Sequence, residues 1–343
     1  MDEPRILVIG HGLIGRQRAG AIAAHPRATL VGTVDPLAPG RDDAPHFTAL
    51  DEVPVRSYDA AVIALPHDLA EVAAHRVLAA GRPVLMEKPL GLRGEQADRL
   101  VQAAADVGRP SFVGYNYRFL PGIRKLLDVT RDGALGPLRT LDLLIGHGGH
   151  PESATGWKLE PARAGGGVVL DPGVHLLDLL LLLDPDLKLA HATATRGFWK
   201  TGIEEDVVLT FAAHERLIAT VRVSHVRWVN TFRIEAIGED GYAIAEGRGG
   251  TYGAQTVRVG RRWAWAEPGA PSQRESEETA DFGPGNVSLA EELYAVIACW
   301  SSAEPVTGPS PATFAEAARV TALCDTVYDQ IGRAEPVAVT AAR

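Results

Sequence analysis

The first residues combine a short apolar strand, a glycine-rich turn and an apolar helix, and few folds begin this way. Arg5 to Ile9 predict the strand, and Gly10-His11-Gly12-Leu13-Ile14-Gly15 follows it directly. Apolar residues then recur at helical spacing as far as Ala24. Glycines at this spacing permit a tight turn, close approach of a pyrophosphate and close packing of helix on sheet. The helix N-terminus would face the phosphates with its partial positive charge. The segment therefore predicts a dinucleotide-binding turn.

A carboxylate at the end of the second predicted strand supports this interpretation. The strand spans Thr29 to Val34, and Asp35 follows it, 20 residues beyond Gly15. A carboxylate there accepts hydrogen bonds from the adenosine ribose and repels a 2′-phosphate. We therefore expect NAD as the cofactor and NADP as the less favoured one. The alternative is that Asp35 is an ordinary turn residue before a proline.

Strands and helices alternate through roughly the first 120 residues. Apolar strands are predicted at 59–65, 83–86 and 111–115, and helices at 69–80 and 95–107. This alternation indicates an α/β fold with a doubly wound parallel sheet. We expect residues 1–120 to form a Rossmann-type NAD-binding domain.

The strand before residue 87 ends in Glu87-Lys88-Pro89. Pro89 stops the strand because proline cannot donate to a ladder. In open α/β sheets, ligands bind just beyond the carboxyl ends of the strands, so Lys88 would point into that crevice. The alternative is a surface lysine at a strand end.

The second half of the chain changes character. Helices are predicted at 121–131, from about 165 to 183, and at 287–300 and 311–331, and short strands with turn signals fill 188–265. Polar and apolar residues alternate in 206–211 and 217–223, as in an antiparallel sheet. We expect residues 121–343 to form an α+β domain, whose closing helix can pack back on the first domain.

A histidine lies close in sequence to two carboxylates within Gly165–Asp178. Asp171 and His175 are four apart, and His175 and Asp178 are three apart, so on a helix they are neighbours. A histidine beside a carboxylate is a plausible general base. The alternative is structural: Asp171 caps a helix that begins with Pro172, and His175 is an ordinary histidine.

Composition narrows the classes of protein. The net charge of −9 disfavours nucleic acid and anionic membranes as partners. The two cysteines indicate neither a disulfide framework nor a zinc site. The N-terminus runs straight into a strand, and the longest apolar run, 176–183, is too short to span a bilayer. We expect a cytoplasmic protein without a metal. A metal hydrolase built on His147, His150 and His175 is a remote alternative.

Together these features resemble the Gfo/Idh/MocA family, the relatives of glucose–fructose oxidoreductase and inositol dehydrogenase. The resemblance covers nearly the whole chain. It is carried by the glycine turn, Asp35, the Glu87-Lys88-Pro89 signature, Arg118 after the 111–115 strand, and the GGGxxxDxGxHxxD run from Gly165. It implies a Rossmann domain followed by a domain with an open, mainly antiparallel sheet that often builds dimers or tetramers.

The resemblance also assigns residues. Lys88, Asp171 and His175 match the catalytic residues of inositol dehydrogenase-like members, whereas glucose–fructose oxidoreductase-like members carry tyrosine at the position of His175. It departs at Leu65, where Thr is usual, and at Ala70, where His is common. The expected substrate contacts are Lys88, Tyr115, Arg118, Trp157, Lys158, Asp171 and His175. The expected cofactor contacts are Gly10, His11, Gly12, Leu13, Ile14, Gly15, Asp35, Leu65, Pro66, His67, Glu87 and Lys88.

We therefore expect hydride transfer between a secondary hydroxyl of a cyclitol, sugar or sugar derivative and a nicotinamide. The alternatives are a keto-sugar reductase, a dihydrodiol-type dehydrogenase, or a dinucleotide-sensing protein without catalysis. We also expect a homodimer or homotetramer joined through the second sheet, because strands there look too apolar to face water. The apolar residues behind that expectation are Trp228, Val229, Phe232, Trp263 and Trp265.

Overall fold

The computed structural model describes residues 3–149, 156–213, 215–262, 277–301 and 309–333. The chain divides into two compact units. The first consists of Met1–Arg118, Ala162–Gly165 and Ser288–Asp325, and the second of Phe119–Pro161, Gly166–Val287 and Thr326–Arg343. The helix α8 (Phe314–Ile331) contains the last of these divisions. The domain boundary expected after residue 120 stays a prediction.

The first unit is built on a seven-stranded sheet with the strand order β15-β6-β5-β4-β1-β2-β3. Its strands are β1 (Arg5–Ile9), β2 (Thr29–Val34), β3 (His46–Phe47), β4 (Ala60–Ile63), β5 (Val84–Met86), β6 (Phe112–Val113) and β15 (Ala312–Thr313). Neighbours from β6 to β3 are parallel, and β15 is antiparallel to β6. The predicted parallel sheet is confirmed. The sequence did not predict β3 and β15, since two residues carry no periodicity.

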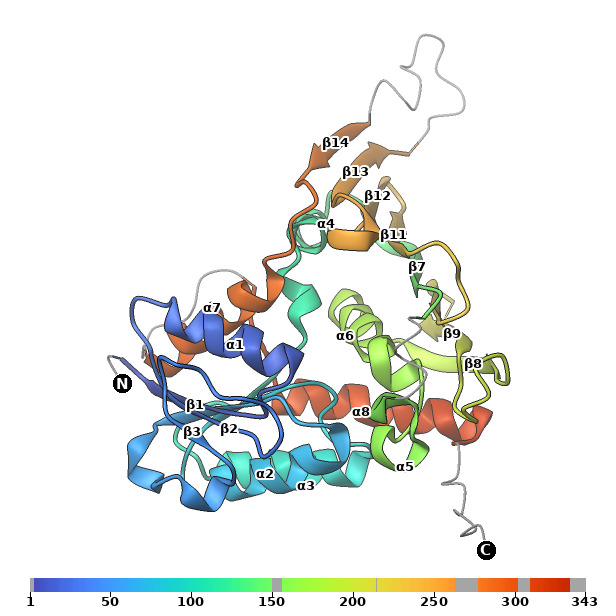
Figure 1. Cartoon of the computed structure of the whole chain (residues 1–343). Helices are drawn as coiled ribbons and strands as arrows, with labels where there is room; N and C mark the ends of the chain where they lie inside the picture. The colour runs from blue at the N-terminus through green and yellow to red at the C-terminus, as the bar shows by residue number, and fades with distance from the viewer. Residues whose placement is uncertain (1–2, 150–155, 214, 263–276, 302–308, 334–343) are drawn as a thin grey trace, which may run out of the picture. The chain divides into compact units, whose positions relative to one another are not determined.

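Helices cover both faces of this sheet (Figure 1). They are α1 (Leu13–Ala23), α2 (His67–Ala79), α3 (Gly94–Ala105) and α7 (Ser288–Ser301). Figure 1 shows α1 and α7 on one face and α2 and α3 on the other. Under α1 and α7, the side chains of Ile22, Leu85 and Trp300 belong to one fully buried cluster. This burial of apolar area is the main force that holds the layers together.

The second unit contains an eight-stranded sheet with the order β14-β13-β12-β11-β7-β10-β9-β8. Its strands are β7 (Leu138–Gly146), β8 (Lys188–Thr195), β9 (Asp206–Ala213), β10 (Leu217–Ser224), β11 (Thr231–Gly238), β12 (Gly241–Glu246), β13 (Thr256–Arg261) and β14 (Glu278–Asp281). Among the described strands of this sheet, only the β7–β10 pair is parallel. The mainly antiparallel sheet that the sequence predicted is confirmed.

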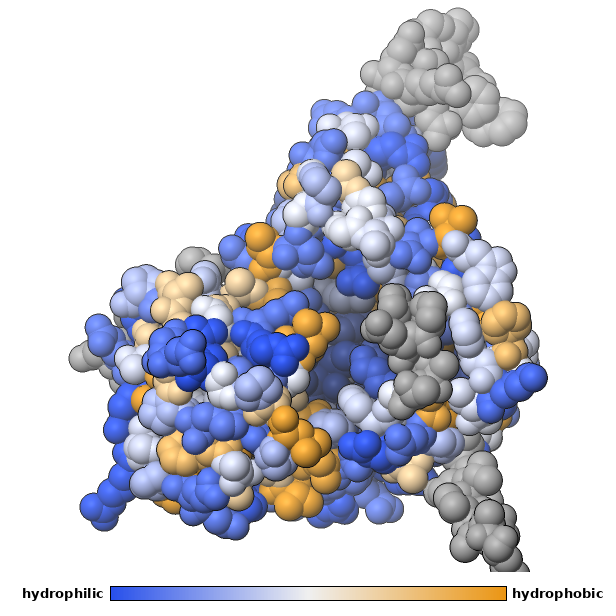
Figure 2. All heavy atoms as spheres, in the orientation of Figure 1, coloured by the Kyte–Doolittle hydropathy of each residue, from blue (hydrophilic) through white to orange (hydrophobic). Residues whose placement is uncertain are grey.

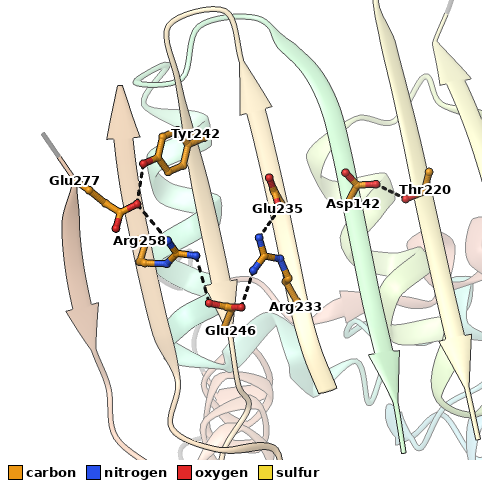
Figure 3. Close-up of polar contacts among 8 residues, drawn as sticks. All are labelled: Asp142, Thr220, Arg233, Glu235, Tyr242, Glu246, Arg258 and Glu277. Atoms are coloured by element: carbon orange, nitrogen blue, oxygen red, sulfur yellow. Dashed lines mark hydrogen bonds and ion pairs between the residues drawn. The ribbon is translucent and has the colours of Figure 1, made fainter. Parts of the chain in front are cut away.

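One face of this sheet contacts α4 (Pro121–Arg131) and α6 (Val174–Leu183). The other face carries a row of charged side chains that pair across the strands (Figure 3). In that row Arg233 donates to Glu246 and Glu235, and Arg258 donates to Glu277. The buried sheet face is therefore apolar and the opposite face is largely polar.

The structure corrects the expectation about the apolar residues of this sheet. Phe232 is only 3% exposed and faces the core, while Trp228 and Val229 lie in the loop between β10 and β11. Trp263 and Trp265 lie outside the described residues. Phe232 therefore needs no cover from a second copy of the chain, because the alternation of side chains along β11 turns it toward the core.

The most apolar stretch of the chain is Pro161–Leu183. Its length and composition would suffice to cross a membrane, but 72% of its most apolar window is buried inside the protein. It is also broken into α5 (Pro161–Ala164), a π-helical turn (Val169–Gly173) and α6. This is the packing of a core helix.

Candidate functional site: two half-sites

The carboxyl ends of three neighbouring strands in the first unit lie in register. Ile9 of β1 pairs with Ile63 of β4, which pairs with Met86 of β5. The ladder runs one step further, because the Glu87 N–H donates to the Ile63 carbonyl at 2.8 Å. Lys88 is the next residue along the chain and is half-buried. Lys88 therefore follows the carboxyl end of β5, which lies two strands away from β1 and its glycine turn.

The glycine turn is required by close contacts. Gly10 has φ +92°, and a Cβ there would lie 2.4 Å from the Ala64 carbonyl oxygen. A Cβ on Gly15 would lie 1.9 Å from the Gly10 carbonyl oxygen. Gly12 is different, because a Cβ there would meet no described atom within 4 Å. The first and third glycines therefore serve packing, and the second leaves open space.

That open space lies at the start of α1. Gly12 is the N-cap and has no side chain to cap the helix, and the first turn reads Leu13-Ile14-Gly15. The first N–H groups of a helix need partners from outside it, and the helix dipole favours an anion. The side chain of Leu13 is 66% exposed. These residues fit the pyrophosphate of a dinucleotide.

Asp35 is tied to the glycine turn. One carboxylate oxygen accepts the His11 N–H at 2.7 Å, and the other accepts the N–H groups of Leu37 and Ala38, both at 2.9 Å. Burial raises the pKa of Asp35, but the backbone hydrogen bonds from His11, Ala38 and Leu37 outweigh it and leave the pKa lowered. The group is therefore a carboxylate at neutral pH. Two oxygens have about four acceptor positions, so capacity remains for ribose hydroxyls.

A buried charge cluster lies directly before Lys88, and sequence reasoning missed it. The side chain of Arg18 in α1 is fully buried and contacts Glu87 at 2.7 Å and Glu292 of α7 at 2.5 Å. It also donates to the Leu289 carbonyl at 2.8 Å. Burial, and then the charge of Glu87, raise the pKa of Glu292 to about 7, against the pull of Arg18. The cluster joins the helix of the glycine turn to the strand that carries Lys88.

The other predicted residues of the first unit are mostly buried. His67, at the start of α2, approaches the Ala164 carbonyl through Nδ1 at 3.1 Å. Tyr115 is fully buried, and Arg118 is 4% exposed and lies 3.4 Å from Glu316. Leu65 and Pro66 are half-buried beyond β4.

An apolar surface lies on α2, the helix that begins at His67. Figure 2 shows orange side chains gathered on the surface over α2. On that helix Leu69 is 49% exposed and Val72 is 65% exposed. They lie one turn apart and form an apolar strip near the start of the helix.

In the second unit, the structure brings Lys158 and Asp171 together. Lys158 Nζ lies 2.5 Å from Asp171 Oδ2, and the lysine side chain is 57% exposed while that of Asp171 is 23% exposed. Lys158 Nζ also lies 6.0 Å from the centre of the Trp157 ring. The pair predicted from the Trp157-Lys158 dipeptide thus has Asp171 as a neighbour, whereas Lys88 belongs to the first unit.

The local conformation corrects the expected helix. Asp171 has φ −150° and ψ 103°, which is extended backbone, and α6 begins only at Val174. The helical i,i+4 argument for Asp171 and His175 therefore fails, and the α6 N-cap is Gly173 rather than Asp171. His175 and Asp178 do lie one turn apart within α6, and both are buried.

A buried glutamate holds the glycine run before Asp171, and sequence reasoning missed it as well. Glu204 Oε1 accepts the Gly167 N–H at 2.8 Å, the Val169 N–H at 3.2 Å and the Tyr328 hydroxyl at 2.7 Å. A Cβ on Gly166 would lie 1.8 Å from that hydroxyl. The glycines are therefore needed for close packing on Tyr328 and Glu204.

His147 lies in the same half-site. Its ring stacks 4.3 Å from that of His225. Burial lowers the pKa of His147; the charge of Asp171 opposes this, and the charges of Arg248 and Lys158 add to it. His150, the other histidine of the metal alternative, lies outside the described residues. Among the described residues, no group of three or more His, Cys, Asp or Glu side chains could hold a metal ion.

Comparison with known proteins agrees with both units. A family model described as "Oxidoreductase family, NAD-binding Rossmann fold" matches residues 4–115, and "GFO/IDH/MocA C-terminal domain" matches residues 123–244. The chain is 25% identical to inositol 2-dehydrogenase 2 of Saccharopolyspora erythraea over 90% of this chain and 97% of that protein. It is 31% identical to 1,5-anhydro-D-fructose reductase of Ensifer adhaerens over 44% of this chain and 45% of that protein.

The first curated relatives are matched over about half of their length, with shares between 44% and 56%. Among solved structures, the WlbA dehydrogenase of Bordetella pertussis, in complex with NADH and UDP-GlcNAcA, has a similar fold. Its TM-score is 0.77 at 22% identity, over 96% of this chain and 95% of the WlbA chain. This likeness concerns the fold.

Proposed function

The chain belongs to the Gfo/Idh/MocA family of oxidoreductases, and we propose that it transfers a hydride between a sugar or sugar derivative and a nicotinamide dinucleotide. The observation that carries the proposal is the row of strand ends in the first unit. Gly10, Glu87 and Lys88 leave the same edge of one parallel sheet, where such folds bind their ligands. A protein that only senses a dinucleotide needs the glycine turn and Asp35 but no lysine at that edge.

We propose NAD as the preferred cofactor and NADP as the weaker one. The support is Asp35, which is ionised and fixed by the His11 N–H beside the glycine turn. A fixed negative charge there repels a 2′-phosphate and accepts ribose hydroxyls. A bound nicotinamide would supply the hydride acceptor or donor.

The chain's own residues then handle the proton and the charge. His175 takes the proton of the reacting hydroxyl as general base. Lys88 donates to a substrate oxygen and stabilises the negative charge that develops on it. Asp171 hydrogen-bonds a substrate hydroxyl, and its ion pair with Lys158 orients its carboxylate. Tyr115, Arg118 and Trp157 remain proposed substrate contacts.

The reverse reaction is the second candidate. The relative matched at 31% identity is a 1,5-anhydro-D-fructose reductase. In that direction His175 would return the proton to the oxygen, and Lys88 would polarise the carbonyl. A dihydrodiol-type dehydrogenase would use the same residues on a different ring.

A substrate panel tests the proposal. Purified protein is incubated with NAD or NADP and a set of cyclitols, sugars and sugar derivatives, and with the reduced cofactors and keto-sugars, while absorbance of the reduced cofactor is recorded. We expect turnover with at least one polyhydroxylated ring, and faster turnover with NAD. Tight dinucleotide binding with no turnover in either direction would favour a sensing protein instead.

We also propose a homodimer or homotetramer joined through the open face of the second sheet. The ion pairs of Figure 3, such as Arg233 with Glu246, already neutralise one another. Ile218 on the same face is 59% exposed. A face with paired charges and exposed apolar residues suits burial against a second copy. A single monomer species by sedimentation at micromolar concentration would contradict this.

The cytoplasm is the proposed location. Cys299 is a free thiol. Free thiols are typical of a reducing compartment. Secretion of the native protein with its activity intact would contradict this assignment.

A further inference from the structure

Five strand ends of the second unit lie in one row. Thr195 of β8 pairs with Asp206 of β9, which pairs with Ser224 of β10, and Ser224 pairs with Gly146 of β7. Gly146 in turn pairs with Thr231 of β11. The loops at 147–149, 196–205 and 225–230 therefore leave the sheet at the same edge. His147, whose pKa responds to the charges of Asp171 and Lys158, stands at this edge.

Aromatic side chains from two of these loops form an exposed cluster, which we call the aromatic cluster: Phe198, Trp199 and Trp228. The Phe198 ring lies 5.1 Å from both tryptophan rings. Phe198 is 58% exposed and Trp228 is 64% exposed. Large apolar side chains that gather in water mark a binding surface more often than scattered ones do.

The aromatic cluster is held rigidly. Glu205, only 5% exposed, accepts the Phe198 N–H at 2.7 Å and the Trp199 N–H at 3.0 Å. The Trp199 indole donates to the His225 carbonyl at 2.9 Å. Lys200 has φ +57°, a left-handed conformation that is costly for a residue with a Cβ. A buried carboxylate and a strained backbone conformation thus both hold these rings in place.

Close packing from the third loop fixes the tryptophans as well. A Cβ on Gly148 would lie 2.7 Å from the Trp228 ring, and a Cβ on Gly149 would lie 2.8 Å from the Trp199 ring. The glycines allow the loop after β7 to lie flat against the rings. The aromatic cluster is therefore preorganised, which lowers the entropic cost of binding.

Three cationic residues lie in these loops or near His147, although the whole chain carries −9. Lys200 follows Trp199 directly, and Arg227 precedes Trp228 and donates its backbone N–H to the His147 carbonyl at 3.3 Å. Arg248 is close enough to lower the pKa of His147. A ligand that pairs a planar ring with a negatively charged linker complements this edge.

We propose that the aromatic cluster is a subsite for the base of a sugar nucleotide, whose phosphates face the neighbouring cations and whose sugar reaches toward Asp171. Aromatic rings stack on nucleobases in offset or edge-to-face arrangements, whichever base is present. This inference rests on the proposed function, because it names the class of substrate for the same site.

Binding of free UDP and dTDP tests the subsite without any hydride transfer. Calorimetric titration should show binding of both, weaker binding of UMP, and a dissociation constant for UDP about tenfold larger in Trp228→Ala, the scale of one stacked base. Trp228→Phe should keep most of the affinity. Phe282→Ala is the matched control, since Phe282 is 39% exposed in the same unit but lies outside the aromatic cluster. It should bind UDP like the unchanged protein.

The inference would be overturned if neither UDP nor dTDP bound, or if Trp228→Ala and the unchanged protein bound UDP with equal affinity. A change in oligomeric state in Trp228→Ala with UDP affinity intact would mark the aromatic cluster as a contact between copies. Binding of phenyl glycosides but not of UDP would also reject the nucleotide. Nucleotide binding without any oxidation or reduction of UDP-sugars, free sugars and cyclitols would instead reject the proposed function and leave the subsite standing.

Discussion

The buried cluster of Arg18, Glu87 and Glu292 makes a prediction about stability and pH. One guanidinium faces two carboxylates, and the side chains of Arg18 and Glu292 are both fully buried. Full ionisation would place two carboxylates beside the Arg18 guanidinium in the core, and although Arg118 adds a further positive charge, burial keeps the proton on Glu292 up to about pH 7. A rise in pKa from 4.5 to about 7 corresponds to roughly 3 kcal/mol.

The sign follows from proton binding. Between about pH 4.5 and pH 7 the folded protein holds a proton on Glu292 that the unfolded chain has lost. Stability contributed by this group is therefore complete below about pH 4.5 and is lost as the pH rises to about 7. Glu292→Gln mimics the protonated acid and cannot titrate. Between pH 5 and pH 8, the unfolding free energy of the unchanged protein should fall by up to about 3 kcal/mol more than that of the variant.

Urea denaturation at pH 5, 6, 7 and 8, followed by circular dichroism, measures this decline. Glu291→Gln is the matched control, because Glu291 is its exposed neighbour on α7. The control should keep the pH dependence of the unchanged protein. The same pH dependence in Glu292→Gln and in the unchanged protein would refute the reasoning, and would mean that Arg18 keeps both carboxylates ionised.

Three further changes probe the half-sites. The unchanged protein should prefer NAD over NADP by at least about tenfold in kcat/KM, roughly 1.4 kcal/mol, and Asp35→Ser should narrow this preference. Equal kcat/KM with NAD and NADP in the unchanged protein would show that the carboxylate does not face the ribose. Glu204→Ala removes three hydrogen bonds of the turn before Asp171 and should lower the unfolding free energy by at least about 2 kcal/mol in urea titrations. An unchanged unfolding free energy would show that Glu204 does not stabilise this turn. His175→Ala should lower the rate of alcohol oxidation by about 10² to 10⁴ and remove the acidic limb of its pH profile; near-normal turnover with that limb preserved would assign the proton to another group.

The first unit could be predicted closely because its signals are local. The strands β1 and β2 have the predicted bounds, since an apolar run between turn residues is visible in the sequence itself. The glycine turn and Asp35 were recognisable for the same reason. Arg18 was not, because its partner Glu292 lies 274 residues away and nothing in the local pattern announces the pair.

The second unit shows where periodicity misleads. Apolar spacing continues through Asp171, so the sequence predicts one helix, yet the backbone is extended at that residue. The ion pair with Lys158 and the hold of Glu204 on Gly167 both arise from tertiary contacts. The sequence also did not indicate that Trp228 is exposed, because a strand and a loop rich in apolar residues look alike in sequence.

The most direct test of the account is Lys88→Ala, assayed for dinucleotide binding and for maximal rate in the same preparation. Because we propose that the Gly10–Gly15 turn makes the pyrophosphate contacts, the dissociation constant for NAD should change little. The maximal rate should fall by about 10² or more, as expected when one electrostatic donor to the reacting oxygen is lost. An undiminished rate with intact NAD binding would contradict the central claim that Lys88 stabilises charge on the reacting oxygen.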